Sequence, residues 1–407
     1  MAANTIITPT WNAREVARVA SNATKFVGAI TRKLSDDFIV SGTKVGATVG
    51  LRLPQRFITT KGQALQPQAI TDVVVPVTIT DQANIGYGWS SFSETLELQD
   101  MYDRYVNPAG YQLANTMDKD GLGRVYQDVF SIEGTPGAIP NANSIYLLAA
   151  ARLTNFAVPD RPRRMFIGSL MRATIVNANL NLFNPPRDIS TLWKDAMFAD
   201  SALSWDEWYE DVNIFPHTVG PLGGAPQTVG AGQTGSSLSV NGFTAAAALR
   251  LNKGDVFTIA GVFAVNPQSY QSTTQLMQFV VTAPVSSDGA GAATIPIYPP
   301  IIPVSTGSAY ATVDVAPAAG APLTIVGAAN TVSPQGLGFH PEAFVCASAD
   351  LVLPRVGEAK RVRLPQMGLS MRYWQASDIM SDQHPSRLDV IYGFKTFRPE
   401  FAVRIAS

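Results

Sequence analysis

The residues that could support chemistry in this chain of 407 residues are few and widely spaced. Cys346 is the only cysteine, and His340 lies shortly before it. A thiolate nucleophile would need such a histidine as its base, together with a third group that orients the base. A buried structural cysteine is the simpler interpretation, and a cytoplasmic cysteine hydrolase remains as an alternative of a different class.

The sequence offers no clear ligand set for a metal or a cofactor. His217, His340 and His384 are far apart and form no H-x-x-x-H pair, and one cysteine cannot make a multi-cysteine zinc site. The glycines of residues 220–224 precede no predicted helix and are better interpreted as a flexible linker than as a phosphate-binding loop. We therefore expect no cofactor and no enzymatic activity.

Aromatic and acidic residues alternate between Trp205 and Asp211. The carboxylates could bind a cation, although a solvated acidic face is at least as plausible. Trp205, Trp208 and Tyr209 could form a ligand platform, but the pattern favours a partly exposed helix or an interface cluster.

Composition favours a protein that associates with copies of itself. The net charge is −1, and charged residues make up 15% of the chain against 46% hydrophobic residues. Much of the surface must then be neutral, as in proteins that bury their outside in subunit contacts. No apolar run reaches the length of a membrane span, and the first residues do not resemble a signal peptide, so a cytoplasmic protein without membrane contact is expected.

One long helix, from Asn107 to Phe130, is the element that must position the rest. Its apolar residues recur at spacings of three and four, at Leu113, Ala114, Met117, Leu122, Val125 and Val129. Asp118, Lys119 and Asp120 are placed mostly on the opposite, polar side. Gly121 and Gly123 weaken the helix and predict a possible break or bend.

Two elements precede this helix. A helix is predicted from Asn12 to Leu34, and its basic residues are opposed only by Glu15. These residues are Arg14, Arg18, Lys25, Arg32 and Lys33. They form either a solvated face or an arm that rests on a partner or near nucleic acid. Alternating residues from Gly46 to Phe92 then predict a long β-hairpin whose tip, Thr59–Gln63, projects from the body.

Short helices and strands follow it. A helix over Ser144–Leu153 is predicted to turn Leu147, Leu148 and Ala151 inward, and a second helix covers Leu170–Phe183. Strands are predicted at Met165–Ile167, Val352, Leu369–Gln375, Leu388–Phe394 and Ala402–Ile405. Between Pro216 and Gly338 charge almost disappears, and short alternating runs separated by Gly or Pro predict an inserted β-barrel. These runs are Leu238–Phe243, Val256–Ile259, Met277–Thr282, Thr294–Tyr298 and Leu323–Val326.

Four stretches resemble a known family. They are Val45–Pro54, Leu251–Val262 with Val265–Pro267, Phe339–Phe344 and Arg387–Gly393. In order and spacing they are similar to the major capsid (coat) proteins of tailed double-stranded DNA bacteriophages, in particular the podovirus-type coat family. That family has a Hong Kong 97-like fold with an inserted domain.

The resemblance implies an α+β capsid fold with six parts. They are an N-terminal arm (1–36), an extended β-hairpin loop (37–93), a peripheral domain with the long spine helix (94–142), the first part of an axial domain (143–215), the inserted all-β domain (216–338) and the completion of the axial and peripheral domains (339–407). The family's insertion carries more charge than residues 216–338, which leaves its intersubunit contacts open.

The resemblance also implies function and partners. We expect self-assembly of pentamers and hexamers into an icosahedral virion capsid around phage DNA, in the host cytoplasm. Scaffolding and portal proteins, a possible decoration protein and non-specifically bound DNA are the implied partners, the last through the basic arm. The alternative within the same fold is the shell of an encapsulin-like compartment that encloses enzyme cargo.

Overall fold

The computed structural model describes residues 24–32, 48–59, 61–62, 67–68, 73–90, 107–179, 203–355, 357–364, 369–378 and 380–407. The chain falls into two compact units, each assembled from segments far apart in sequence. The first comprises Met1–Arg52, Val74–Leu122 and Phe344–Phe397, and the second comprises Leu53–Val73, Gly123–Ala343 and Arg398–Ser407. Both contain strands together with helical residues, which confirms the predicted α+β class.

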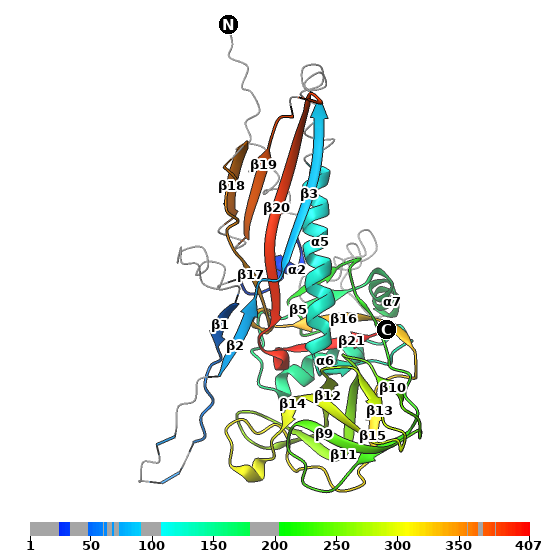
Figure 1. Ribbon diagram of the computed structural model, residues 1–407. Helices are drawn as coiled ribbons and strands as arrows, with labels where there is room; N and C mark the ends of the chain where they lie inside the picture. Colours follow the sequence, from blue (N-terminus) through cyan, green and yellow to red (C-terminus); the bar gives the residue numbers. More distant parts are fainter. Residues whose placement is uncertain are drawn as a thin grey trace. The chain divides into compact units, whose positions relative to one another are not determined.

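An antiparallel sheet forms the body of the first unit (Figure 1). Its strands are β17 (Phe344–Ser348), β20 (Gln383–Thr396), β19 (Leu369–Gln375), β18 (Glu358–Leu364) and β3 (Asp81–Ser90), which pairs with β20. Alternate side chains of β20 point to opposite faces, so Leu388, Val390 and Tyr392 are buried together. The Tyr392 hydroxyl donates to Asp120 at 2.6 Å, which ties the sheet to helix α5 (Asn107–Val125).

Helix α5 runs unbroken through both of its glycines and continues as a 3-10 turn, η2 (Tyr126–Asp128). The predicted break is therefore wrong, and so is an α-helical end at Phe130. A Cβ at Gly121 would lie 2.8 Å from the ring of Phe26, and a Cβ at Gly123 would lie 3.1 Å from the ring of Phe215. The glycines thus give room to aromatic rings. No helix among the described residues is long and apolar enough to cross a membrane.

Helix α2 (Phe26–Ala29) is the described part of the predicted N-terminal helix. Its first turn donates to the buried carboxylate of Asp118, from the backbone N–H of Lys25 at 2.7 Å and of Val27 at 3.0 Å. The prediction that Asp118 lies on a polar face was wrong, because the carboxylate caps this helix. Helix α2 ends at Ala29 because Thr31 pairs with Val345, so the prediction fails for residues 30–32. Residues 12–23, 33 and 34 lie outside the described residues.

The predicted hairpin is shorter than expected. Strands β1 (Thr48–Arg52) and β2 (Val74–Thr78) pair antiparallel, with Leu51 opposite Val75. Strand β3 does not extend this ribbon but joins β20 along ten paired positions. A long partner strand with a buried face competes successfully with the local hairpin. The predicted tip, Thr59–Gln63, lies partly outside the described residues.

A second sheet organises the second unit. Its order is β4 (Ile132–Glu133), β21 (Ala402–Ala406), β16 (Val332–Phe339), β5 (Arg164–Ile167) and β6 (Glu207–Glu210), and β7 (Pro216–Thr218) also pairs with β16. Gly336 and Gly338 lie on the same face of β16. A Cβ added at Gly336 would contact Met171, and one added at Gly338 would contact Trp205. Met171 belongs to helix α7 (Ser169–Asn179), and Trp205 donates from Nε1 to the carbonyl of Tyr146 in helix α6 (Asn143–Asn155) at 3.2 Å.

Three local predictions fail in these regions. Helix α6 buries Tyr146, Ala149, Ala150 and Leu153, whereas Leu147 and Leu148 are 44% and 51% exposed and Ala151 is also exposed. Residues 207–210 form strand β6 rather than a helix, because they pair in parallel with β5. Val352 is 80% exposed and belongs to no strand. The helix predicted over Leu170–Phe183 is present as α7 as far as Asn179, and residues 180–183 lie outside the described residues, so its predicted end stays a prediction.

The charge-poor segment folds as a β-barrel. Its main sheet has the order β15 (Leu323–Ile325), β11 (Val256–Val265), β12 (Ser272–Val281), β14 (Ala293–Ile301), β9 (Gly235–Phe243) and β8 (Gly224–Thr228). The backbone N–H of Thr228 in β8 donates to the carbonyl of Ala321, just before β15, at 3.0 Å. This hydrogen bond joins the two edges of the sheet. Strands β10 (Ala248–Leu251) and β13 (Val285–Ser287) form a separate pair. The strands predicted in this segment are confirmed.

The chain enters and leaves the barrel through paired strands. Pro216 of β7 lies opposite Pro334 of β16, so the two connections are neighbours. This is the arrangement predicted for a domain inserted into a core, since neighbouring ends leave the core chain undisturbed. Independent folding of residues 216–338 stays a prediction. Three short 3-10 turns complete the fold, namely η3 (Val304–Thr306), η4 (Pro341–Ala343) and η5 (Pro399–Phe401).

Candidate functional site

The thiol of Cys346 has the surroundings of a structural cysteine. Cys346 lies buried in strand β17, where it pairs with Phe394 of β20. Its backbone N–H donates to the carbonyl of Thr31 at 3.2 Å. Burial raises the pKa of the Cys346 thiol to about 12. The thiolate that a hydrolase would need is therefore strongly disfavoured, and the predicted buried, structural position of Cys346 is confirmed.

We expect Cys346 to resist alkylation in the folded protein. With its pKa near 12 rather than 9.0, the thiolate fraction at neutral pH falls roughly 1000-fold, and burial also blocks the reagent. Mass spectrometry of the protein after timed exposure to iodoacetamide measures this rate. Full labelling in denaturant serves as the control. Labelling of the native protein as fast as that of an unfolded chain would contradict the expectation.

The three histidines lie in different surroundings. Nε2 of His217 lies 2.8 Å from Asp255, and Nδ1 of His384 lies 2.9 Å from the Ser377 hydroxyl. His340 accepts a hydrogen bond from the backbone N–H of Glu342, and burial lowers the pKa of its ring. Within the described ranges, no group of three His, Cys, Asp or Glu side chains could hold a metal ion.

The acidic residues around Trp205 are engaged by arginines rather than arranged for a cation. Arg164 donates from Nε to Glu207 at 2.6 Å, and Arg172 pairs with Glu210. Arg164 and the Tyr209 hydroxyl lower the pKa of Glu207 against the effect of its desolvation. Trp205 is buried beneath the sheet, and Asp206, Glu207 and Glu210 already have arginine partners. These surroundings do not favour the ligand platform, which was the weaker alternative from the sequence.

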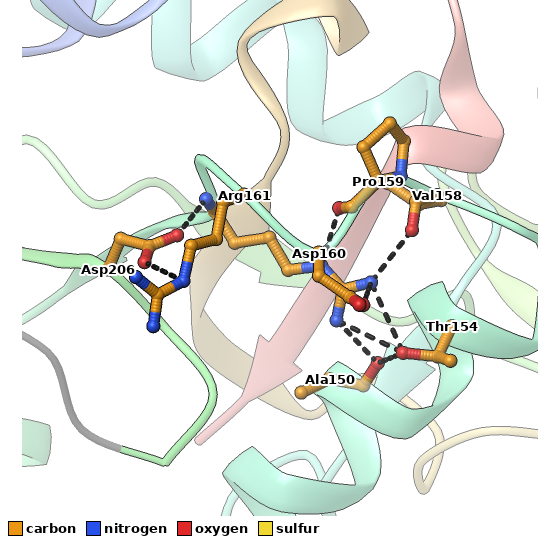
Figure 2. Close-up of polar contacts among 8 residues, drawn as sticks. Ala150, Thr154, Val158, Pro159, Asp160, Arg161 and Asp206 are labelled. Carbon is orange, nitrogen blue, oxygen red and sulfur yellow. Dashed lines mark hydrogen bonds and ion pairs between the residues drawn. The ribbon is translucent and has the colours of Figure 1, made fainter.

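A buried arginine, Arg163, joins helix α6 to the start of β5 (Figure 2). Its guanidinium donates to five oxygen atoms, those of Ala150 O (3.3 Å), Thr154 Oγ1 (3.1 Å), Val158 O (2.9 Å), Pro159 O (3.0 Å) and Asp160 Oδ1 (3.2 Å). Its backbone N–H donates to Asp206, which also pairs with Arg161 at 3.3 Å. Burial lowers the pKa of Arg163, and the carboxylates of Asp160 and Asp206 oppose that shift.

Arg163→Met should lower the free energy of unfolding by about 3 kcal/mol, because several buried carbonyls would lose their donor. Denaturant unfolding followed by tryptophan fluorescence measures the loss. Arg161→Met is the matched control two residues away, since Arg161 is 82% exposed and makes one ion pair. An exposed pair contributes about 0–1 kcal/mol. Equal effects of the two variants would show that the burial of Arg163 has no energetic weight.

A cavity of about 730 Å³ opens beside Arg163. Its lining includes Leu147, Ala151, Thr154, Asp160, Arg161 and Asp206. Thr154, Asp160 and Asp206 in this lining are already bonded to Arg163, as described above. The exposed Leu147 at its rim is better suited to contact with another protein surface.

A smaller hollow of about 380 Å³ lies at the start of helix α7. It is surrounded mainly by apolar residues, among them Ile139, Leu170, Val212, Ile214, Val332 and Pro334. Val212 is 95% exposed and Leu170 is 67% exposed. Side chains of this kind, gathered around one hollow, are typical of a protein contact surface.

The predicted basic arm is only partly described. Lys25 is exposed and Arg32 is half-buried, at the two ends of helix α2. Arg14, Arg18 and Lys33 lie outside the described residues. The structure therefore does not bring the five predicted basic residues together in one described surface.

Sequence reasoning missed a buried polar cluster beneath the barrel. Asp255 lies close to His217 and accepts the backbone N–H groups of Gly220 at 3.0 Å and Asn252 at 2.8 Å. Nearby, the fully buried Arg404 donates to the carbonyl of Gly254 at 2.9 Å. Burial lowers the pKa of Arg404 to about 10, although neighbouring acidic groups, among them Asp255, oppose that shift. The turn at 252–255 was the one available signal, but its distant partners could not be inferred.

Comparison with known proteins identifies a family similarity in part of the chain. Residues 235–405 match the model of the family described as "P22 coat protein - gene protein 5". This stretch, which is less than half of the chain, is similar to the coat protein of that family. The resemblance to phage coat proteins that was inferred from the sequence is thereby confirmed over residues 235–405. The insertion as a separate domain stays a prediction.

Three of the solved structures that are similar to this chain are described below. The structure titled "Mycobacterium phage Che8" has 12% identity over 94% of this chain and 90% of its own, with a TM-score of 0.48. The mature capsid of bacteriophage PhiM1 has 9% identity over 94% of this chain and 86% of its own, with a TM-score of 0.46. The CUS-3 coat protein I-domain has 26% identity over 26% of this chain and 97% of its own, with a TM-score of 0.20. No curated protein matches the chain.

Proposed function

We propose that this chain is a phage major capsid protein and that it assembles in rings of five and six into a closed icosahedral shell around double-stranded DNA. The family match over residues 235–405 is the observation that carries this proposal. Exposed apolar side chains support it, because a monomer would leave them in water. They include the pair Leu147 and Leu148 on helix α6 and the surroundings of the smaller hollow.

The finer assignments follow from the same family. The shell is built in the host cytoplasm and becomes the virion capsid, with a scaffolding protein, a portal and possible decoration as partners. The role is structural and involves no catalysis, which the burial and raised pKa of the Cys346 thiol support.

Electron microscopy and mass measurement of the purified protein test the assembly. Closed particles with five- and six-fold rings are expected, and their contents should be DNA in infected cells. Only monomers under several salt and concentration conditions would refute the shell. Particles that enclose a protein and no DNA would instead identify a compartment of the encapsulin type.

The N-terminal basic residues give a separate prediction. Charge reversal at Arg14 and Arg18 is expected to reduce DNA packaging or scaffold docking more than folding, since both interactions depend on positive charge. Particle DNA content and the thermal midpoint of the variant are compared with those of the unchanged protein. A collapse of the thermal midpoint would show that these arginines serve the fold instead.

A further inference from the structure

The start of the extended loop, residues 53–59, belongs to the same compact unit as the barrel. Residues 53–73 form one unit with 123–343 and 398–407, whereas strands β1 and β2 on either side belong to the other unit. Two-stranded ribbons are marginally stable alone, so contacts elsewhere must hold such a segment. The question is which groups supply those contacts.

Arg56 contacts two groups outside this segment. Its Nη2 atom lies 3.2 Å from Oε1 of Glu400 in turn η5, and both side chains are largely buried. Its guanidinium also lies 5.8 Å from the centre of the Tyr310 ring, which belongs to the barrel segment. A guanidinium near an aromatic ring and beside a carboxylate gains from both neighbours.

A second contact lies one residue further along. The Tyr270 hydroxyl is 3.5 Å from the carbonyl of Phe57 and 3.3 Å from the carbonyl of Ala309. One tyrosine of the barrel therefore lies between the loop and the barrel's own connection that carries Tyr310. The two contacts together engage consecutive residues of the loop.

The barrel is itself firmly attached within this unit. The Gln278 side chain accepts from the backbone N–H of Ile132 at 2.8 Å and donates to its carbonyl at 2.9 Å, in a buried position. Arg404 adds its hydrogen bond to Gly254, and the rings of Phe130 and Tyr298 lie 6.1 Å apart. A surface held in this way can restrain a segment that rests on it.

Turn η5 is braced as well. Arg398 stacks on the ring of Phe401 at 3.6 Å and pairs with Glu342 at 3.4 Å, and its Nε lies 3.5 Å from Glu400. Glu400 is thus held in place before Arg56 reaches it. A preorganised carboxylate needs less ordering when it forms an ion pair.

We infer that the inserted barrel and turn η5 together hold residues 53–59 in one conformation, with Arg56 as the positioning residue. This gives the insertion a task within its own chain, in addition to any contact with other subunits. The inferred restraint on residues 53–59 does not rest on the proposed function. That the loop is thereby presented to neighbouring copies does rest on it.

Hydrogen–deuterium exchange of the full chain tests this inference. In Arg56→Ala, peptides covering residues 53–59 are expected to exchange about tenfold faster, while barrel peptides stay unchanged. Glu400→Gln should give the same pattern to a smaller extent, because Arg398 keeps its other partners. Lys61→Ala, in the same loop and exposed, is the matched control and should change nothing.

Three results would overturn the inference. They are unchanged exchange at 53–59 in Arg56→Ala, an equal increase in the Lys61 control, or an increase spread evenly over the barrel, which would mean that Arg56 holds the barrel and not the loop. Exchange is measured on the chain whether or not it forms shells. Failure of this inference is therefore distinguishable from failure of the proposed function.

Discussion

Asp255→Ala should lower the free energy of unfolding of the second unit by about 3–5 kcal/mol, because several buried donors lose the acceptor that they share, at about 1–3 kcal/mol for each. The carboxylate is buried and lies 2.8 Å from His217 Nε2. Its removal also leaves the N–H groups of Gly220 and Asn252 without an acceptor, and it withdraws a negative charge from the neighbourhood of the buried Arg404. Denaturant unfolding followed by tryptophan fluorescence measures the loss.

Two companion variants locate the cause. Asp255→Asn keeps an oxygen acceptor and should fall between the unchanged protein and Asp255→Ala. Glu358→Ala removes an exposed carboxylate and should stay within about 0.5 kcal/mol of the unchanged protein. If Asp255→Ala were as mild as Glu358→Ala, the buried cluster would have no part in holding the barrel to its unit.

Gly393→Ala should be the most disruptive single-methyl change in the first unit. A Cβ at this position of β20 would lie 2.2 Å from the carbonyl oxygen of Thr78 and 2.9 Å from the Cα of Ile79. Both contacts are with backbone, which cannot rotate away as a side chain can. We expect a loss of about 1–3 kcal/mol or more, together with displacement of the connection between β2 and β3.

Gly86→Ala is the control for that variant. Gly86 lies in the strand next to β20, and the nearest atom to an added Cβ is 3.9 Å away. It should be tolerated, so the comparison separates the close backbone contact from a general cost of replacing glycine in a strand. Thermal unfolding and exchange of the 74–80 peptides report the two effects. A Gly393→Ala variant as stable as Gly86→Ala would contradict the geometry.

Periodicity predicted the elements that are long or strictly alternating. The apolar spacing from Leu113 to Val125 is that of helix α5, and the alternating runs of the barrel segment became strands with their odd or even side chains buried. Even the neighbouring entry and exit of the insertion followed from a general argument about connections. These features depend on residues close together in sequence.

The failures share a different cause, which is tertiary contact. Helix α6 has two apolar sides, and only its packing partners decided that Tyr146 is buried while Leu147 is exposed. The sequence pattern places Asp118 on the surface, but its carboxylate is buried because it accepts the backbone N–H of Val27. Trp208 and Tyr209 lie in a helix-like pattern but pair with β5. Local propensity is a weak prior wherever a strand or a cap from elsewhere competes.

The polar sites were the least predictable. Arg163 donates mainly to backbone carbonyls, which carry no signal of residue type. Arg404 and Asp255 are far apart in sequence, and without the fold nothing joins them. The preference for a structural cysteine could be argued from the sequence, but the burial that raises the pKa of the Cys346 thiol could not.

The order of strands in the second sheet has a consequence for synthesis on the ribosome. Strand β4 forms near residue 132, yet its partner β21 is the last strand in chain order and also pairs with β16. The barrel strands lie between them in sequence and pair only with one another. We therefore expect the barrel to fold while the chain is still growing, and the surrounding sheet to close only after Ala402–Ala406 has left the ribosomal tunnel. Until then the exposed edge of β16 would be a binding site for chaperones.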